Sequence, residues 1–255
     1  MREFSQLFHD LDESTKTNDR IDQLVKYLLE ASPEDSIWVC WFLAGNRIKG
    51  AIKTSELRTF ASERSGLPQW LLEECHDRVG DLAETISLLV ATEGSGEILS
   101  LSEWIIKFIE PMIGMDTEGR RENIFRVWDF LGEQDFLPFH KLLTGGFRMG
   151  VSKGNLCKAL ARVGGVQPAI IAQRLTGNWS PKTLSLEGIL NPGDDEDRLC
   201  QPFPFCLANP LQEEAENLGR LEDWQVEWKW DGIRAQLINR GGTCMIWSRV
   251  GISGR

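Results

Sequence analysis

The sequence predicts a mainly α protein in two parts, an all-α region over residues 1–195 and the first strands of an incomplete α/β domain over residues 196–255. Through most of the first part, apolar residues recur at the three- and four-residue spacing of amphipathic helices. The turn-forming residues 191–193 and the acidic run 194–197 end this pattern. Short segments of strand-like composition follow, so we expect the boundary near 190–205.

The composition is that of a folded protein whose charge is unevenly distributed. The chain has 255 residues, of which 42% are hydrophobic and 26% charged, and its net charge of −10 argues against a simple nucleic-acid binder. Residues 1–137 carry a net charge of −12 and residues 194–226 one of −7, whereas residues 138–193 carry +6 and residues 227–255 carry +3. The basic stretch between acidic ones is therefore a candidate anion-binding surface.

The spacing of the cysteines and histidines, and the short length of the apolar runs, argue against several classes of protein. The 6 cysteines form no Cys-x-x-Cys pair, which argues against a zinc site and a disulfide framework. The N-terminus has no signal-peptide core, and the longest apolar run, 37–44, is too short to cross a bilayer. His9, His76 and His140 lack metal-ligand spacing. We therefore expect a reduced, cytoplasmic protein with no membrane segment and no metal ligands among these histidines.

The helices are placed by apolar spacing and by their caps. Ser32 followed by Pro33 and an acid at 35 is typical of a helix start, and Ser100 with Glu103 forms a capping box. Apolar positions at helical spacing predict one helix over the segment that contains Ile21, Leu24, Val25, Leu28 and Leu29. Another is expected from 33 to about Gly45, and further ones near 54–65, 69–79, 80–91, 101–113, 119–131, 135–144, 153–163, 167–175 and 181–187. The apolar faces of these helices are expected to bury Trp38, Trp41, Trp70, Trp104 and Trp128.

Strands are predicted only near the end of the sequence, at 225–229, 234–239 and 243–248, with hairpin-turn residues at 239–242. A sheet domain of roughly 50 residues without a finished core would be marginal. We therefore expect the chain to be an N-terminal fragment whose second domain is truncated. The alternative is a small β unit packed on the helices.

One candidate catalytic motif, Glu-Trp-Lys-Trp-Asp-Gly-Ile-Arg, occupies residues 227–234. On a strand, Glu227, Lys229 and Asp231 would share one face, and the two tryptophans would anchor the other face in a core. Lys229 would then face a polar pocket between two acids. A lysine in this position can act as a nucleophile once its amine loses its proton. Because two flanking acids would raise its pKa, a bound metal and phosphates would have to offset them. The alternative is a surface lysine in an acidic salt-bridge cluster.

A glycine-rich stretch in the basic segment is a candidate phosphate site. Thr144, Gly145 and Gly146 precede Arg148, and Gly150 is followed by Ser152 and Lys153 at the start of a predicted helix. Exposed amides at a helix N-terminus, with a serine and a lysine beside them, suit a phosphate. The alternative is an ordinary glycine-rich loop beside a solvated basic helix face.

The motif at 227–234 resembles motif I of the covalent nucleotidyltransferases, which include ATP-dependent DNA ligases and mRNA capping enzymes. Ser-Arg-Val-Gly at 248–251 is similar to their motif Ia. The resemblance implies that Lys229 is the adenylylated nucleophile, that Glu227 lies beside the adenine and that Arg234 contacts the nucleotide. It also implies that Arg249 contacts the AMP ribose or the 5′-phosphate of a nick.

The helical part resembles the DNA-binding domain of larger ATP-dependent DNA ligases, a domain that capping enzymes lack. The similar segments are 141–153, 79–85, 174–179 and 202–205. The resemblance is nearest to bacterial ligases. It implies a helical DNA-binding domain over 1–195 and the beginning of an adenylation (nucleotidyltransferase) domain with an ATP-grasp-like fold over 196–255. It assigns contacts with the DNA minor groove and backbone to five residues: Thr144, Arg148, Gly150, Ser152 and Lys153.

The expected function of the whole protein is therefore ATP- and Mg²⁺-dependent sealing of nicks in duplex DNA, during repair, replication or recombination, by a monomer. We expect this chain alone not to ligate and hardly to label itself with AMP. Three alternatives stay open: a non-catalytic module that binds duplex DNA or nicks, a helical protein-interaction scaffold, and an RNA ligase or capping-type transferase.

Overall fold

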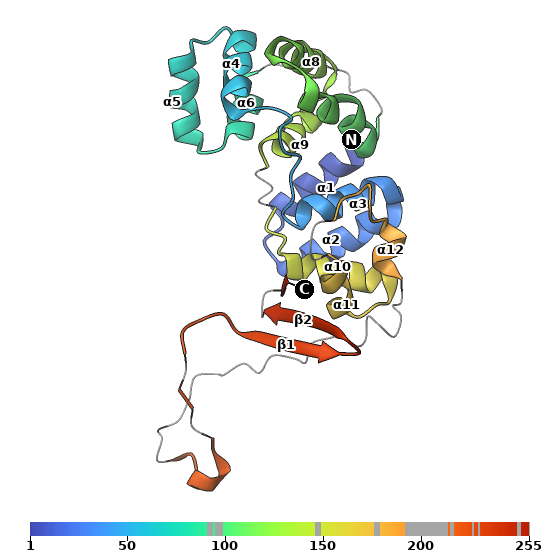
Figure 1. Ribbon diagram of the computed structural model, residues 1–255. Helices are drawn as coiled ribbons and strands as arrows, with labels where there is room; N and C mark the ends of the chain where they lie inside the picture. The colour runs from blue at the N-terminus through green and yellow to red at the C-terminus, as the bar shows by residue number, and fades with distance from the viewer. Residues whose placement is uncertain are drawn as a thin grey trace.

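The computed structural model describes residues 1–90, 94, 99–145, 149–175, 179–191, 214, 217–225, 227–228, 230–248 and 251–254. Its elements confirm the mainly α prediction (Figure 1). The α-helices are α1 Arg2–Glu13, α2 Thr17–Glu30, α3 Pro33–Leu43, α4 Thr54–Ser65, α5 Gln69–Val79, α6 Leu82–Leu89, α7 Leu101–Trp104, α8 Thr117–Phe130, α9 Glu133–Thr144, α10 Lys153–Gly164, α11 Pro168–Arg174 and α12 Leu186–Leu190. The shorter elements and strands are η1 Ile105–Ile109, η2 Glu110–Gly114, η4 Leu221–Asp223, β1 Ala235–Arg240, β2 Thr243–Ser248 and β3 Gly251–Gly254.

Local signals placed most helix ends correctly. The helices predicted at 54–65 and 69–79 coincide with α4 and α5, because each has a left-handed glycine directly after its last residue. Helix α1 was not predicted, although its buried residues Phe4, Leu7, Phe8 and Leu11 follow helical spacing. The helix expected over 101–113 is interrupted, since α7 passes into the π-helix η1 and the 3-10 helix η2.

The caps of α3 and α7 are linked through one buried carboxylate. The Asp35 amide donates to Ser32 Oγ at 3.1 Å, so the predicted start of α3 is confirmed. The Asp35 side chain does not return to its own helix. It accepts the amides of Leu101 at 3.0 Å and Ser102 at 2.8 Å, in the first turn of α7. One residue therefore joins two helix N-termini that lie far apart in the sequence.

Three local predictions were wrong. The helix expected at 181–187 begins later, because the amides of Thr183 and Leu184 close a turn on the Ser180 carbonyl and Ser185 caps α12 instead. The strand expected at 225–229 is not formed by the residues of this segment that the structure describes. Trp70 on α5, expected in the core, is 65% exposed, because its side of α5 meets no other helix among the described elements.

The other four tryptophans confirm the expected core. Trp104 and Trp128 are fully buried, Trp38 is buried, and Trp41 packs partly buried against them. A single cluster of apolar side chains runs from α1 to α12 and holds the helices together. Helix α10 packs on α2 and α11, while α9 packs on α1 and α6. No helix in the described part of the chain combines the length and apolar character needed to span a bilayer.

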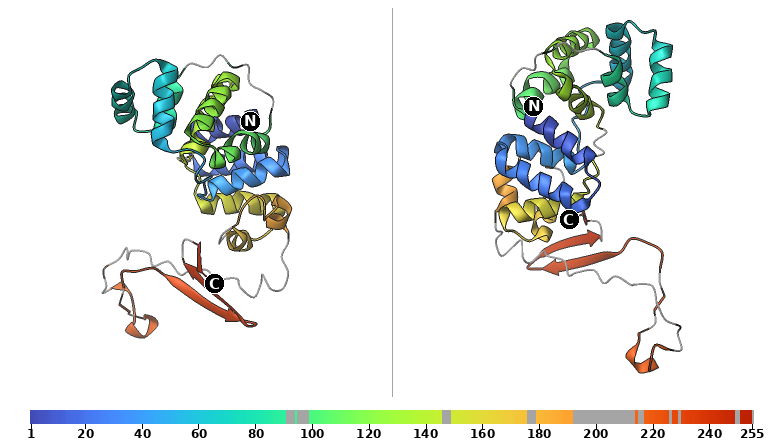
Figure 2. Two further views of the ribbon diagram at one scale, coloured as in Figure 1. Left: turned by 45° about the horizontal axis from the view of Figure 1, so that its top comes forward. Right: turned by 180° about the vertical axis from the view of Figure 1, so that it is seen from behind.

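The C-terminal strands form a small antiparallel sheet in the order β1-β2-β3. Ala235 pairs with Ser248 and Arg240 with Thr243. Of the predicted hairpin-turn residues 239–242, Gly241 and Gly242 form the turn, whereas Asn239 and Arg240 belong to β1. Ile238, Met245 and Trp247 form a separate small cluster that packs against Ala172 of α11. Figures 1 and 2 show the sheet below α11 and the segment around η4 extending away from the helices.

Candidate nucleic-acid interface

The glycine-rich stretch forms the connection between α9 and α10. Helix α9 ends at Gly145, which has a left-handed φ of 74°. Thr144 lies in the last turn, where its hydroxyl donates to the His140 carbonyl at 3.0 Å. Gly150 is left-handed as well, with a φ of 64°. Arg148 lies outside the described residues, so the structure places the two ends of this loop but not its tip.

The N-terminus of α10 faces this loop. Ser152 is its N-cap, and the Asn155 amide donates to Ser152 Oγ at 3.2 Å. The first amides of an α-helix have no acceptor within the helix, and the helix dipole favours an anion at this end. Lys153 is the first helical residue and is half-buried, whereas the adjacent Gly154 is exposed and carries no side chain. This arrangement leaves space and donors for a phosphate oxygen.

Two arginines from the acidic N-terminal segment approach the loop closely. A Cβ on Gly150 would lie 2.4 Å from the Arg20 guanidinium carbon, and a Cβ on Gly145 would lie 2.9 Å from Arg47 Cδ. Arg20 Nε donates to the Leu11 carbonyl at 3.2 Å, and its Nη1 donates weakly to the Gly150 carbonyl at 3.4 Å. The left-handed backbone angles favour glycine at both positions, and the absence of a side chain lets the two arginines lie close to the loop.

Sequence analysis did not point to Arg20 or Arg47, because both come from the segment with a net charge of −12. Arg20 belongs to α2, which packs against α10, and Arg47 follows α3. The two arginines become candidates for DNA contact only because packing brings these segments beside the loop. Gly45 and Asn46, which precede Arg47, predicted the end of a helix and not an interface.

Much of the positive charge in segment 138–193 is used internally. Lys141 pairs with Asp81 at 2.7 Å, Arg162 with Asp22 at 2.6 Å and Lys182 with Glu110 at 2.7 Å. Arg174 donates to the carbonyls of Ile189 and Asn191 at the end of α12. Lys153 and Lys158 form no ion pair with the residues that the structure describes. The cations of this segment without an ion-pair partner among the described residues thus lie on α10, whereas Lys182 is paired but still 65% exposed.

The Asp81–Lys141 pair stabilises the helices beside this surface. Burial by itself would raise the pKa of Asp81, but the hydrogen bonds from Lys141 and from the Glu84 amide outweigh that effect and hold the pKa below its usual value. Asp81 also caps α6. Lys141 is therefore better explained as a structural partner of α6 than as a ligand-binding cation.

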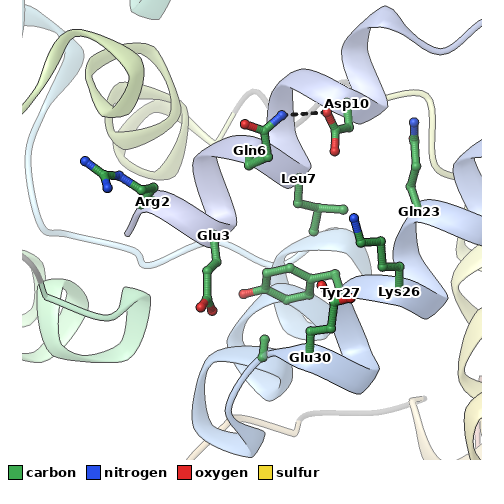
Figure 3. Close-up of a pocket in the computed structure, with 10 residues that line it drawn as sticks. Arg2, Glu3, Gln6, Leu7, Asp10, Gln23, Lys26, Tyr27 and Glu30 are labelled. Carbon is green, nitrogen blue, oxygen red and sulfur yellow. Dashed lines mark hydrogen bonds between the residues drawn. The ribbon is translucent and has the colours of Figure 1, made fainter.

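A hollow between α1 and α2 has a different character (Figure 3). Tyr27 projects from α2 toward α1, and its buried hydroxyl has no hydrogen-bond partner. Burial also raises the pKa of Tyr27. The acidic side chains of Glu3, Asp10 and Glu30 outnumber the two cations that line this hollow, so it does not suit a phosphate.

The candidate nucleotide motif does not form an enclosed site. Lys229 and Arg249 lie outside the described residues, and Glu227 and Arg234 are exposed. Trp228 is 87% exposed and Trp230 81%, so the expected anchoring of these tryptophans in a core is not observed. The described residues also contain no group of three side chains able to hold a metal ion. The described residues of the motif therefore do not by themselves enclose a nucleotide.

Comparisons with known proteins agree with the helical architecture. A sequence model of the family described as "DNA ligase N terminus" matches residues 1–161. A "Probable DNA ligase" from Koribacter versatilis (strain Ellin345) is 26% identical over 248 residues, which cover 93% of this chain and 42% of that protein. Another "Probable DNA ligase", from Anaeromyxobacter sp. (strain Fw109-5), is 32% identical over 122 residues, or 46% of this chain and 23% of that protein.

The chain thus spans less than half the length of the curated relatives that it matches. The matched residues 1–161 include α1 to α9, the start of the loop after α9 and most of α10, and therefore the whole set of cations around that loop. Because this match covers more than half of the sequence, the chain belongs to the family of DNA ligase N-terminal regions.

Proposed function

We propose that this chain docks a DNA ligase onto duplex DNA at a nick, with the loop between α9 and α10 against the sugar–phosphate backbone. One observation carries the proposal: Arg20, Arg47 and Lys153 come from three separate elements and surround a loop that leads into an uncovered helix N-terminus. Phosphate oxygens accept hydrogen bonds from such groups whatever the base sequence. This suits an enzyme that must act at any nick.

In this proposal each predicted DNA-contact residue has a distinct role. Gly150 keeps the backbone close to Arg20, and Ser152 holds the first turn of α10 in place. Lys153 supplies a charge beside the amides, and Thr144 can donate its hydroxyl proton to a phosphate in place of the His140 carbonyl. Arg148, which lies outside the described residues, is proposed to contact the minor groove.

We further propose that the complete enzyme uses ATP and Mg²⁺ and seals nicks through AMP carried on Lys229. Glu227, Arg234 and Arg249 would bind the nucleotide. The support for this is the motif resemblance and the names of the relatives. We also infer a cytoplasmic monomer that acts in DNA repair, replication or recombination. Because the described part of the motif does not enclose a nucleotide, we expect this chain alone to label hardly at all with AMP.

Incubation with ATP labelled at the α-phosphate tests this last expectation. The chain and its Lys229→Ala variant should show the same background. Strong labelling that disappears in Lys229→Ala would contradict it and would mean that these 255 residues already form a working nucleotide site.

The docking proposal is tested by binding to nicked, intact and single-stranded DNA over a series of salt concentrations. Duplex binding should weaken steeply with salt, with a slope of about −0.9 per phosphate neutralised. An Arg148→Ala/Lys153→Ala variant should bind more weakly and with a shallower slope. Arg78→Ala is the matched control, since it removes an exposed cation from α5, far from α10 (Figure 1).

The outcomes separate the docking module from the scaffold. If the chain binds no DNA at low salt, or if Arg78→Ala weakens binding as much as the loop variant does, the proposal is wrong. In the first case a protein-interaction scaffold becomes the better interpretation. A preference for RNA ends over DNA ends, or for GTP over ATP, would instead favour an RNA ligase or capping-type transferase.

A further inference from the structure

A groove of about 680 Å³ lies between the turn that follows α3, the 3-10 helix η2 and the turn at 179–183. Its charged and hydroxyl-bearing lining residues are Arg47, Lys49, Glu110, Ser180, Lys182 and Thr183. Three of these are cations, and they come from two segments more than 100 residues apart in the sequence. The Ser180 and Thr183 hydroxyls lie within 3.2 Å of each other on the opposite wall.

The two walls of the groove are tied together by indole hydrogen bonds. Trp41 Nε1 donates to the Trp179 carbonyl at 3.0 Å, which joins α3 to the turn at 179–183. Trp179 Nε1 donates to the Leu175 carbonyl at 3.0 Å, at the end of α11. Both indole N–H groups are therefore already used. The Thr183 hydroxyl is used as well, since it donates to the Ser180 carbonyl at 3.1 Å. The groups left to bind a ligand are the cations, which recognise phosphate oxygens.

The charges in the groove are balanced by a single acid. Lys182 pairs with Glu110 at 2.7 Å, but its side chain is still 65% exposed. Arg47 and Lys49 are exposed, and neither forms an ion pair with the described residues. Glu110 is only 24% exposed, but the lysine end of the pair is open to solvent, so Lys182 can turn from Glu110 to a phosphate.

One residue links the groove to the loop before α10. Arg47 lines the groove, and its Cδ would lie 2.9 Å from a Cβ on Gly145, which follows α9. The same side chain can therefore contact a DNA strand at the loop and in the groove.

We propose that this groove is a second contact for the DNA sugar–phosphate backbone, in which Lys49 and Lys182 bind phosphates and Glu110 holds Lys182 until DNA arrives. The inference rests on the proposed docking function and extends it to residues outside the loop. It predicts that Lys182→Ala weakens DNA binding and Glu110→Gln tightens it, whereas the same charge changes on α5 leave binding unchanged.

Binding of nicked duplex DNA over a salt series tests the groove, with Lys49→Ala, Lys182→Ala and Glu110→Gln variants of this chain. Lys49→Ala should weaken binding at low salt by roughly three- to tenfold and reduce the salt slope by about one. Lys182→Ala should weaken it further, because it leaves Glu110 unpaired beside a phosphate. Glu110→Gln should tighten binding, because it releases Lys182 and removes a negative charge.

The controls are Arg78→Ala and Glu74→Gln, which make the same charge changes on exposed residues of α5. At physiological salt, charges that far from the groove are screened. At that salt, both control variants should therefore bind DNA with the affinity of the parent chain. Thermal melting of each variant checks that the fold is retained, since the residues changed are on the surface.

Lys153→Ala, tested in parallel, distinguishes this inference from the docking function. If Lys153→Ala weakens binding while all three groove variants bind like the parent, the loop docks DNA and the groove proposal is wrong. If no protein binds duplex DNA, the docking function itself fails. Groove variants that bind nicked duplex like the parent but lose binding to single-stranded DNA would also overturn the proposal, because the lysines would then contact a single strand.

Discussion

At the scale of single residues, the loop before α10 depends on a glycine whose neighbour is an arginine from another helix. Gly150 has a φ of 64°, which disfavours any side chain, and Arg20 occupies the space in which a Cβ would lie. The sequence suggested a flexible glycine-rich loop. The structure shows instead that close approach of a cation is a second reason for glycine at this position.

Gly150→Ala is therefore expected to lower the free energy of unfolding by roughly 1–2 kcal/mol, because it adds left-handed strain and displaces Arg20. Urea denaturation measures this change, and duplex binding should weaken as well. Gly154→Ala is the stability control, since the atom nearest to its Cβ is Ser152 Oγ at 3.7 Å. Equal stability of the two variants would show that Arg20 does not constrain the loop.

His140 is the residue whose protonation most directly opposes folding. It is fully buried, and burial lowers its pKa to about 4 even though its ring hydrogen bonds with the Phe136 carbonyl. Trp128 Nε1 donates to His140 Nε2 at 2.8 Å, which requires an unprotonated nitrogen at that position. The structure therefore places His140 in the core.

The stability of the folded chain should fall as the pH is lowered, because His140 must then take up a proton. The pKa of this histidine is 6.5 in the unfolded chain but about 4 in the folded chain. Its contribution to stability is therefore complete above pH 6.5 and is lost as the pH falls toward 4. The maximum loss is roughly 3 kcal/mol. Urea denaturation between pH 7 and pH 4 measures it. His140→Gln should be less stable at pH 7 but lose less on acidification; an unchanged pH dependence would assign the effect to other groups.

At the scale of elements, helix starts were predicted well because a cap is a contact between residues three or four apart. Ser32, Ser100 and Ser152 all cap the helices that follow them. The wrong prediction at 181–187 has a local cause too. Ser180 followed by Pro181 is typical of a helix start, but here these residues begin a turn. The helix begins only after the next capping serine, Ser185.

Asp35→Ala should be the most damaging cap variant, because it leaves two buried amides of α7 without acceptors. We expect a loss of roughly 2–4 kcal/mol in the free energy of unfolding, measured by chemical denaturation. Glu34→Ala, in the same turn of α3 but exposed, should change it by less than about 0.5 kcal/mol. Similar losses from both variants would mean that the helix dipole, rather than the bonds to α7, accounts for the effect.

At the scale of the whole molecule, the helical part and the sheet have separate cores. The main cluster takes its buried residues from between Met1 and Ile189, while the sheet contributes Ile238, Met245 and Trp247 and meets the helices at Ala172. A small apolar contact of this kind stabilises the helices little. The predicted division near residue 195 remains a proposal that this arrangement supports.

A chain that ends at residue 195 should therefore melt within a few degrees of the 255-residue chain and bind duplex DNA with the same affinity and salt slope. Circular dichroism and the binding assay measure both properties. Aggregation or a clearly lower melting temperature would show that the sheet is needed to complete the helical core.

The sequence by itself determined that the chain is mainly helical, where most helices begin and end, that Trp104 and Trp128 are in the core, and that a phosphate site is expected before α10. These features depend on contacts between residues close in the sequence or on the period of one helix. Only the tertiary structure decided that Arg20 and Arg47 flank the loop, that Lys141 and Arg162 are neutralised, and that Trp70 is exposed. Those features depend on which surfaces meet when distant helices pack, and side-chain packing between elements leaves no periodic signal in the sequence.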